Sequence, residues 1–365
     1  MLFVKVDELK PGMRLGKPIY NKNGVLLYDR DTRLTMQVIY GIRNFGLMGL
    51  YILEPAEPVP PMSEEDINFE RFQTMAVFSI REDLDLIAAG KKDKGLDWLC
   101  SLILKNYANV PHKINFIQSL RSSEDFVYKH SINVALLAAI IAGKMSMPQG
   151  RINTIVKAAL LHDCGGVKVN QAGDADEDPE MKNAIRVNTR EILKNHKDLD
   201  ESIFNTIEHM QVLCAGSDSD SKEAVEAARS NSRAAILHVA DAYDRMTAMK
   251  SYEEPTSEVK ALRVLLSDPD KYDPVAVQAL INGINILNPG VCVELSGHDK
   301  GVVIIENERD IFQPWVLSFR DNQLHDLSDR TKNPDLELVD IMKTMDNRIK
   351  LDPDILKEYA SVERK

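Results

Sequence analysis

The residues with the clearest chemical potential are a histidine and an aspartate that stand side by side, His162 and Asp163, at the end of an apolar segment. Burying an imidazole and a carboxylate together costs several kcal/mol unless the two groups pair or hold a cation. One buried hydrogen bond would explain an isolated pair. However, His130 lies in an apolar stretch upstream and Asp241 in another downstream. Two imidazoles and two carboxylates predict a site for a divalent transition metal: Mn, Fe, Co or Zn.

The elements that must position these residues are helices. Apolar residues recur at spacings of three and four through most of residues 64–288, which is typical of amphipathic and buried helices. An all-α core of seven or more helices is therefore predicted. The expected helical segments are 69–89, 95–107, 122–146, 150–163, 200–213, 222–250 and 273–286. Two acidic loops, 170–180 and 214–221, interrupt this pattern.

Shorter β-rich segments flank the helical core. Residues 1–53 are predicted to form a small β-rich domain with one helix at 35–45, and the Pro-rich stretch 54–62 is predicted to be a linker. A helical domain over 63–288 is followed by a β-rich extension and closing helices over 289–365. In that extension, strands are expected at 291–295, 301–305 and 315–319, and helices at 336–349 and 353–362. The fold class is thus mainly α, with a small β-rich domain at the N-terminus and a short β-rich extension at the C-terminus.

Composition narrows the classes of function. The 365 residues include 45 Lys and Arg against 56 Asp and Glu, a net charge of −11, which argues against broad binding to nucleic acid or to an anionic membrane. Any anionic ligand must therefore meet a local cationic pocket. The longest apolar run, 134–142, is far shorter than the ~20 residues that span a bilayer, and the four cysteines form no CxxC pair. We expect a soluble, cytoplasmic protein with reduced cysteines.

The order of these residues resembles a known family. His130, the pair His162-Asp163 and Asp241 resemble the H…HD…D signature of the HD-domain metal-dependent phosphohydrolases. Residues 239–247 (VADAYDRMT) are similar to the VADxYDALT motif of the HD-GYP branch, which hydrolyses the bacterial second messenger cyclic di-GMP. Matching pieces extend over roughly residues 2–305. The resemblance implies an HD-domain fold and a metal-dependent phosphodiesterase, with His162 and Asp163 at the catalytic centre.

The resemblance also implies how metals would be held. One metal would take His130, His162, Asp163 and Asp241, all of which are present. Of the second metal's ligands, only Asp163, Glu208 and His209 remain, with Glu208 in place of an imidazole. We therefore expect one metal rather than two. Candidate metal ligands are thus His130, His162, Asp163, Glu208, His209 and Asp241.

A further imidazole lies close to the last of these ligands. His238 is three residues before Asp241, on the same face of the expected helix, and is a candidate substitute ligand for the second metal. The alternative is a histidine that is simply buried or solvated.

Several motifs depart from the family pattern. The HDxGK lysine is replaced in 162–166 (HDCGG), although Lys168 follows, and a later family histidine aligns near Ile185. The GYP motif is replaced near 215–218 (AGSD), and the RPYR segment reads KSYE at 250–253. These losses predict weak turnover. The candidate substrate-binding residues that remain are Lys168, Arg190, Lys250 and Tyr252.

The charges around the expected site have opposing effects on a ligand with two phosphates. The acidic residues of the two loops would slow encounter with such a ligand, unless they are only a solvated surface. These residues are Asp174, Asp176, Glu177, Asp178, Glu180, Asp218 and Asp220. The basic residues that could line a pocket are Lys168, Arg186, Arg190, Arg233, Arg245 and Lys250.

Two functions stay open. One is a metal-dependent phosphodiesterase that acts on cyclic di-GMP or a related nucleotide. The other is a catalytically inactive receptor or protein-interaction module in cyclic di-GMP signalling, with protein partners or a second copy of the chain. Retention of four costly polar residues in an apolar core favours the first. Nucleic-acid binding and membrane insertion are disfavoured by the acidic balance and the short apolar runs.

Overall fold

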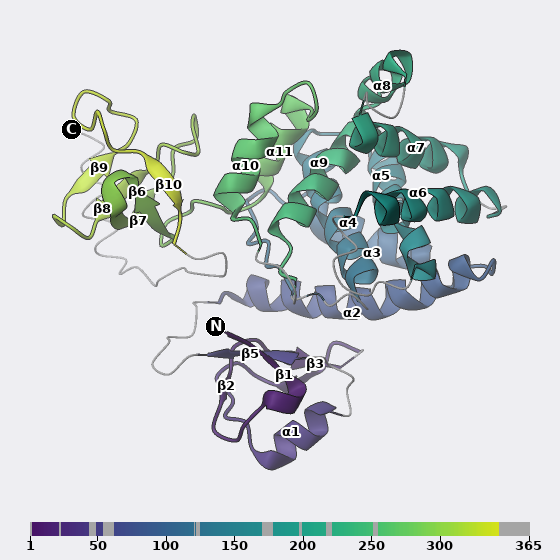
Figure 1. Cartoon of the computed structure of the whole chain (residues 1–365), viewed down its shortest axis with the longest axis horizontal. Coiled ribbons are helices and arrows are strands. Elements are labelled where there is room, and N and C mark those ends of the chain that lie inside the picture. The colour runs from purple at the N-terminus through teal and green to yellow at the C-terminus, as the bar shows by residue number, and fades with distance from the viewer. Residues whose placement is uncertain are drawn as a thin grey trace. The chain divides into compact units, whose positions relative to one another are not determined.

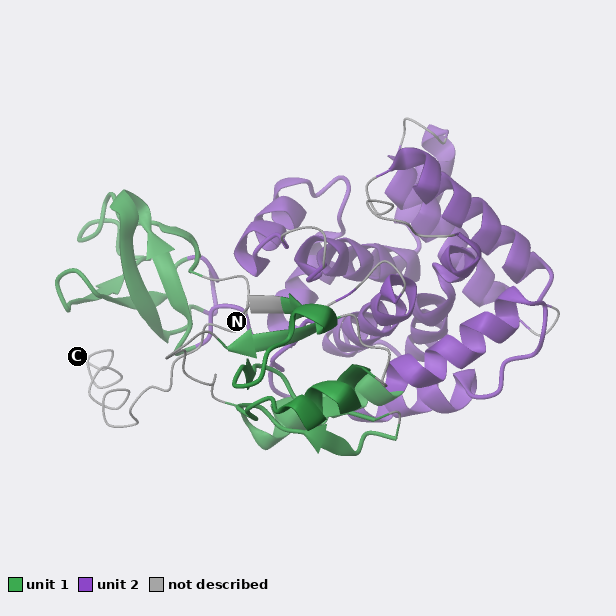
Figure 2. Cartoon of the chain, turned by 60° about the horizontal axis from the view of Figure 1, so that its bottom comes forward, with its two compact units in different colours: residues 1–75, 289–307, 313–365 green, residues 76–288, 308–312 purple. Residues whose placement is uncertain are grey.

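The computed structural model divides the chain into two compact units (Figure 2). The first comprises residues 1–75, 289–307 and 313–365, and the second comprises residues 76–288 and 308–312. The structure describes residues 2–21, 23–43, 49–53, 62–119, 121, 125–169, 178–196, 199–216, 221–250 and 255–342. Every residue of the predicted metal cluster belongs to the second unit.

The second unit is built from helices (Figure 1). They are the later part of α2 (Glu64–Ala88), α3 (Leu96–Tyr107), α4 (Phe126–Lys144), α5 (Gln149–Leu161), the 3₁₀ helix η2 (Cys164–Lys168), α6 (Pro179–Lys194), α7 (Glu201–Ala215), α8 (Lys222–Arg229), α9 (Ser232–Thr247), α10 (Glu258–Ser267) and α11 (Pro274–Gly283). The expected all-α core is confirmed.

Helix α4 is the centre of this unit. It packs against α3, α5, α9 and α11, and almost all its residues are buried. A helix that is apolar on every side is stable in water only when other elements surround it. Although α4 has the length and hydropathy of a membrane span, 83% of its most apolar 18-residue window is buried inside the protein. It is therefore a core helix, and it carries His130 into the interior.

Helix α9 runs beside α4 and begins at a definite cap. The side chain of Asn231 accepts a hydrogen bond from the Arg233 backbone N–H, which satisfies one of the free donors of the first turn. This cap also explains one error of the sequence analysis. The stretch 222–250, expected as one helix, is two helices, because Ser230 and Asn231 end α8 and start α9.

Two helices were not predicted. α6 starts at Pro179, inside a stretch expected to be a loop, with Asp178 as its N-cap, and its mean hydropathy is low. Its buried residues nevertheless recur at helical spacing: Ile185, Thr189, Ile192 and Leu193. The second, α10, is likewise capped, by the side chain of Ser257.

The first unit contains the β-rich segments. Near the N-terminus, strands β1 (Leu2–Lys5), β5 (Gly49–Leu53) and β2 (Arg14–Leu15) form an antiparallel sheet, β3 (Ile19–Tyr20) pairs with β4 (Leu26–Tyr28), and α1 (Met36–Arg43) follows. The buried core there includes Leu15, Leu34, Ile39 and Ile42. This agrees with the expected small β-rich domain with one helix. Residues 54–61 of the expected linker lie outside the described part of the chain.

The C-terminal segment forms a five-stranded antiparallel sheet in the order β10-β6-β7-β8-β9. Its strands are β6 (Cys292–Leu295), β7 (Asp299–Ile305), β8 (Trp315–Ser318), β9 (Leu324–Asp326) and β10 (Leu338–Ile341). The helix expected from residue 336 is wrong over β10, because Leu338–Ile341 pairs with β6 and buries Leu338 and Asp340 in alternation. The helix expected at 353–362 lies outside the described residues.

Substitution of Gly143 tests the close packing of α4. A Cβ atom at Gly143 would lie 1.6 Å from the Ala108 carbonyl oxygen, so the backbone of one segment would have to move. We expect Gly143→Ala to lower the free energy of unfolding by about 1–3 kcal/mol. The measurement is urea unfolding followed by the helical circular-dichroism signal.

The matched control is Gly150→Ala on α5, where a Cβ atom meets nothing within 4 Å. This control should be neutral or stabilising by about 0.5–1 kcal/mol. Equal stability of the two variants would contradict the packing.

Candidate metal centre

His130 is the innermost residue of the site. It lies one turn into α4, and its side chain is fully buried. Its Nδ1 lies 2.7 Å from Asp244 Oδ2, and its Nε2 lies 2.9 Å from Asp241 Oδ1. A carboxylate at Nδ1 orients the ring and makes Nε2 a stronger ligand, as in carboxylate–histidine–metal arrangements. Asp244 therefore fixes the orientation of the His130 ring from the side away from Asp241.

His162 is also oriented from behind. It follows the last residue of α5, and its Nδ1 lies 2.7 Å from the Ala159 carbonyl oxygen. Because a carbonyl oxygen only accepts, Nδ1 carries the proton of the neutral ring and Nε2 carries the lone pair. That Nε2 lies 3.2 Å from His130 Nε2 and 3.2 Å from Asp241 Oδ1. The Nε2 atoms of the two histidines thus converge on one point.

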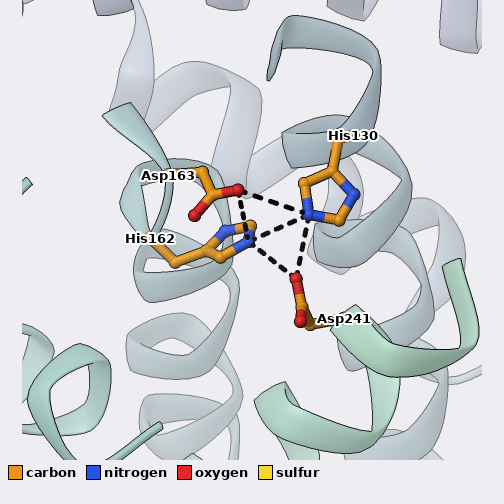
Figure 3. Close-up of side chains that lie close together, drawn as sticks. All are labelled: His130, His162, Asp163 and Asp241. Atoms are coloured by element: carbon orange, nitrogen blue, oxygen red, sulfur yellow. Dashed lines mark hydrogen bonds and ion pairs between the residues drawn. The ribbon is translucent and has the colours of Figure 1, made fainter. Parts of the chain in front are cut away.

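Asp163 completes the cluster shown in Figure 3. Its Oδ2 lies 3.7 Å from His130 Nε2 and 3.8 Å from His162 Nε2. The ligand atoms of these two histidines, Asp163 and Asp241 all lie within 4.8 Å of one another. Bonds of about 2.0–2.2 Å would place neighbouring ligand atoms of a tetrahedral transition-metal site about 3.4 Å apart. Both the chemistry and the spacing of the four atoms therefore fit one divalent transition metal.

The loop that carries Asp163 is held tightly against α6. The Gly165 N–H donates to Thr189 Oγ1 at 3.0 Å, and Thr189 is completely buried. A Cβ atom at Gly165 would lie 2.3 Å from the Ile185 carbonyl oxygen and 2.4 Å from the Thr189 nitrogen. Only glycine allows this approach of η2 to α6.

A buried ion pair supports the back of the cluster. Both oxygens of Asp244 accept hydrogen bonds from the Arg121 guanidinium at 2.6 Å, and neither side chain is exposed. Gln118 and Asn133 add amide hydrogen bonds to Asp244 Oδ1, each at 3.1 Å. Burial alone would raise the pKa of Asp244, but Arg121 and His130 outweigh it and hold that pKa far below its usual range. Asp244 therefore stays ionised behind His130.

A second guanidinium lies on the open side of the cluster. Arg245 forms an ion pair with Asp163 Oδ2, and its Nε donates to Asp241 Oδ1 at 2.9 Å. Burial would raise the pKa values of both aspartates, but Arg245 together with His130 and His162 outweighs it and both pKa values are lowered. For His162, burial lowers the pKa, yet the nearby carboxylates of Asp163 and Asp241 reverse the sign and the net shift is upward.

A cavity of about 550 Å³ opens beside the cluster. Asp163 and Asp241 line it together with apolar side chains such as Met210, Met246 and Tyr272. Its basic lining residues are Lys182, Arg186, Arg245, Lys250 and Lys271. Five positive charges against two negative ones make this a cationic cavity in an acidic protein. It is the kind of local pocket that the net charge requires for an anionic ligand.

The candidate substrate-binding residues have different surroundings. Lys250 lines the cavity, as do Arg186 and Arg245 of the basic set. Lys168 and Arg190 are absent from the described lining, as is Arg233 of the basic set. Tyr252 lies outside the described residues, as do Asp174, Asp176, Glu177, Asp218 and Asp220 of the acidic loops.

Two of the expected ligands of a second metal, Glu208 and His209, lie outside the cluster. Glu208 forms an ion pair with Arg190 Nε at 2.6 Å, and His209 Nδ1 bonds the Asn231 amide at 3.0 Å. His238 lines the cavity and stacks on Tyr272 with ring centroids 5.0 Å apart. Burial lowers the pKa of His238 to about 4. Within the described residues, the metal-type cluster therefore consists of the four ligands expected for the first metal.

Comparison with known proteins agrees with this geometry. The sequence model of the HD domain family matches residues 127–246, which include all four clustered residues. A curated protein of Pseudomonas aeruginosa, named cyclic di-GMP phosphodiesterase PA4108, is 24% identical over 216 residues, which cover 57% of this chain and 51% of that protein. This chain thus spans about half the length of that relative.

One solved structure also resembles the chain. It is the structure of Bd1817, an HDG"Y"P protein from Bdellovibrio bacteriovorus, and the match covers 76% of this chain and 97% of that one. The TM-score is 0.40 and the sequence identity is 13%, below the level that establishes a common fold.

Removal of one partner of the buried ion pair should destabilise the helical unit. Arg121→Met leaves Asp244 charged and buried without its guanidinium, so we expect a loss of about 3–5 kcal/mol in the free energy of unfolding. Urea denaturation followed by circular dichroism measures this. Lys94→Met, which breaks an exposed ion pair with Glu82, is the control and should change stability little. Similar losses in both variants would show that Arg121 is not a special support.

Proposed function

We propose that the chain is a divergent protein of the HD-GYP type, a metal-dependent phosphodiesterase that hydrolyses cyclic di-GMP or a related nucleotide with weak turnover. The observation that carries the proposal is the convergence of four acceptor atoms beside a cationic cavity. The two carboxylates among these four atoms repel each other unless a cation lies beside them. A cluster of this kind suits a metal site better than a structural hydrogen bond.

The residues of the cluster would divide the work as follows. His130 and His162, each oriented through Nδ1, offer neutral nitrogen ligands, and Asp163 and Asp241 add charge at the cavity wall. When bound there, a divalent ion would activate water and stabilise negative charge on a phosphoryl oxygen. Asp163 and His162 are the residues that we place at the reacting phosphate.

The cavity supports a phosphorylated ligand. Its volume of about 550 Å³ is within the usual range of small-molecule sites. Arg186 and Lys250 offer charge-assisted hydrogen bonds to phosphate oxygens, and Tyr272 offers an aromatic face. The named activity of the Pseudomonas aeruginosa relative supports cyclic di-GMP as the ligand. A nucleotide messenger of this kind is consistent with the cytoplasmic location that we propose.

We propose one bound metal rather than two. The expected second set is engaged elsewhere, since Glu208 pairs with Arg190 and His209 with Asn231. Two-metal sites hold the nucleophile and the leaving oxygen between their ions, so a single ion accounts for the weak turnover that we propose.

One observation favours a second function, a receptor that binds the nucleotide without hydrolysing it. Arg245 already pairs with both Asp163 and Asp241, so the chain itself supplies a counter-ion to the cluster. In that state the remaining cations of the cavity would still attract a phosphorylated ligand. The metal content of the purified chain distinguishes the phosphodiesterase from the receptor, because only the phosphodiesterase needs a bound metal.

Elemental analysis of the full chain, purified without chelator or oxygen, tests the metal site. We expect about one transition-metal ion per chain and none in His162→Ala, because that variant loses a nitrogen ligand. His325→Ala, which changes a histidine outside the helical unit, should keep the ion. Unchanged circular dichroism of His162→Ala would show that the loss is not caused by unfolding. A metal-free wild-type protein with intact fold would exclude the enzyme and leave the receptor.

Ligand affinity tests the cavity. Arg186→Gln should weaken cyclic di-GMP binding about tenfold, because it removes charge-assisted hydrogen bonds to phosphate. Isothermal titration calorimetry at two salt concentrations measures the affinity and its ionic part. Arg229→Gln on α8, which removes the same charge outside the described lining of the cavity, is the control. Equal affinities of the two variants would argue against this cavity as the binding site.

A further inference from the structure

We propose that Arg245 is an internal cation that competes with the divalent metal for Asp163 and Asp241, and that it turns to the phosphorylated ligand once the metal is bound. This inference rests on the proposed metal site. Its evidence is that guanidinium and metal would use the same atoms. Arg245 contacts Asp163 Oδ2 and Asp241 Oδ1. These are the oxygens from which the spacings to both histidines are measured.

Simultaneous occupancy is unfavourable on electrostatic grounds. A carboxylate oxygen that binds a divalent ion carries less charge for a guanidinium, and the two cations would repel across a few ångströms in a buried site. The aspartates are 16% and 5% exposed, so water screens this repulsion poorly. Arg245 therefore stabilises the metal-free state selectively.

The surroundings of Arg245 allow it to leave. Its side chain is 26% exposed and lines the cavity, whereas Arg121, the guanidinium that pairs with Asp244, is completely buried. Arg245 can thus rotate into the cavity without opening the helical core. It lies one turn after Asp241 on α9, so a change of side-chain rotamer is sufficient.

This movement would couple the two ligands. A metal that displaces Arg245 releases its guanidinium from the two carboxylates, and phosphate oxygens in the cavity can then accept its hydrogen bonds in pairs. Metal would then raise the affinity for the nucleotide, and nucleotide would raise the affinity for metal by the same factor. The arrangement makes Arg245 a specificity residue for anionic ligands in the metal-loaded protein.

Metal titration of the full chain tests the competition. Mn²⁺ is titrated calorimetrically into metal-free wild type, Arg245→Ala, Arg245→Lys and Lys271→Ala. We expect Arg245→Ala to bind Mn²⁺ about a hundredfold more tightly than wild type, because two charge-assisted hydrogen bonds no longer need to be broken. Lys271→Ala removes one positive charge from the same cavity, and its described contacts involve neither carboxylate. It should change the affinity less than about threefold.

Thermal unfolding gives a second readout. Without metal, Arg245→Ala should melt below wild type, because Asp163 and Asp241 lose their counter-ion, and Mn²⁺ should raise its melting temperature more than that of wild type. Arg245→Lys keeps a charge but cannot bridge both oxygens with one planar group, so it should bind Mn²⁺ with intermediate affinity.

The outcomes separate this inference from the proposed function. If Arg245→Ala is folded and binds Mn²⁺ no more tightly than a wild type that does bind it, the competition is excluded and the metal site stands. If Arg245→Ala binds Mn²⁺ and wild type does not, the competition is supported and favours the receptor. If neither protein binds Mn²⁺, Zn²⁺ or Co²⁺, both the competition and the metal site are excluded.

Discussion

Two imidazole nitrogens and two carboxylate oxygens meet inside the helical unit, and two carboxylates this close together require a counter-ion. The residues around the cluster supply the opposite charges and hold the ligand atoms in place. Asp244 holds His130 from behind and is itself held by Arg121, so the anionic charge at the back is balanced by a buried guanidinium. On the side that faces the cavity, Arg245 pairs with both Asp163 and Asp241. The helices α4, α5 and α9 supply the rigid frame.

Much of this follows from the sequence, for a physical reason. A helix such as α4 is apolar along its whole length, so a histidine within it has to be buried, and buried histidines need partners. The same reasoning applies to His162-Asp163 and Asp241, and all four residues come together as expected. Each of these predictions depends on a local property of the sequence. That property is either the helical spacing of apolar residues or the free-energy cost of burying one polar side chain.

The features that the sequence analysis missed depend on partners that are distant in the chain. Arg245 meets Asp163, 82 residues away, and Glu208 turns to Arg190 rather than to the cluster. The spacing of Asp241, Asp244 and Arg245 does place them on one helix face, and this was the available signal. Strand β10 was mistaken for a helix because its conformation is set by pairing with β6, not by its own residues.

The contact between Gly165 and α6 has a consequence for the shape of the cavity. Arg186 lies one residue after Ile185, the residue whose carbonyl oxygen faces Gly165, and it lines the cavity. A methyl group at residue 165 would push η2 and α6 apart and would displace Arg186 along with α6. Gly165 thus affects the width of the cavity, although the described lining of the cavity does not include it. A substitution of Gly165 would therefore change which ligands the cavity can hold without changing any of the four clustered residues.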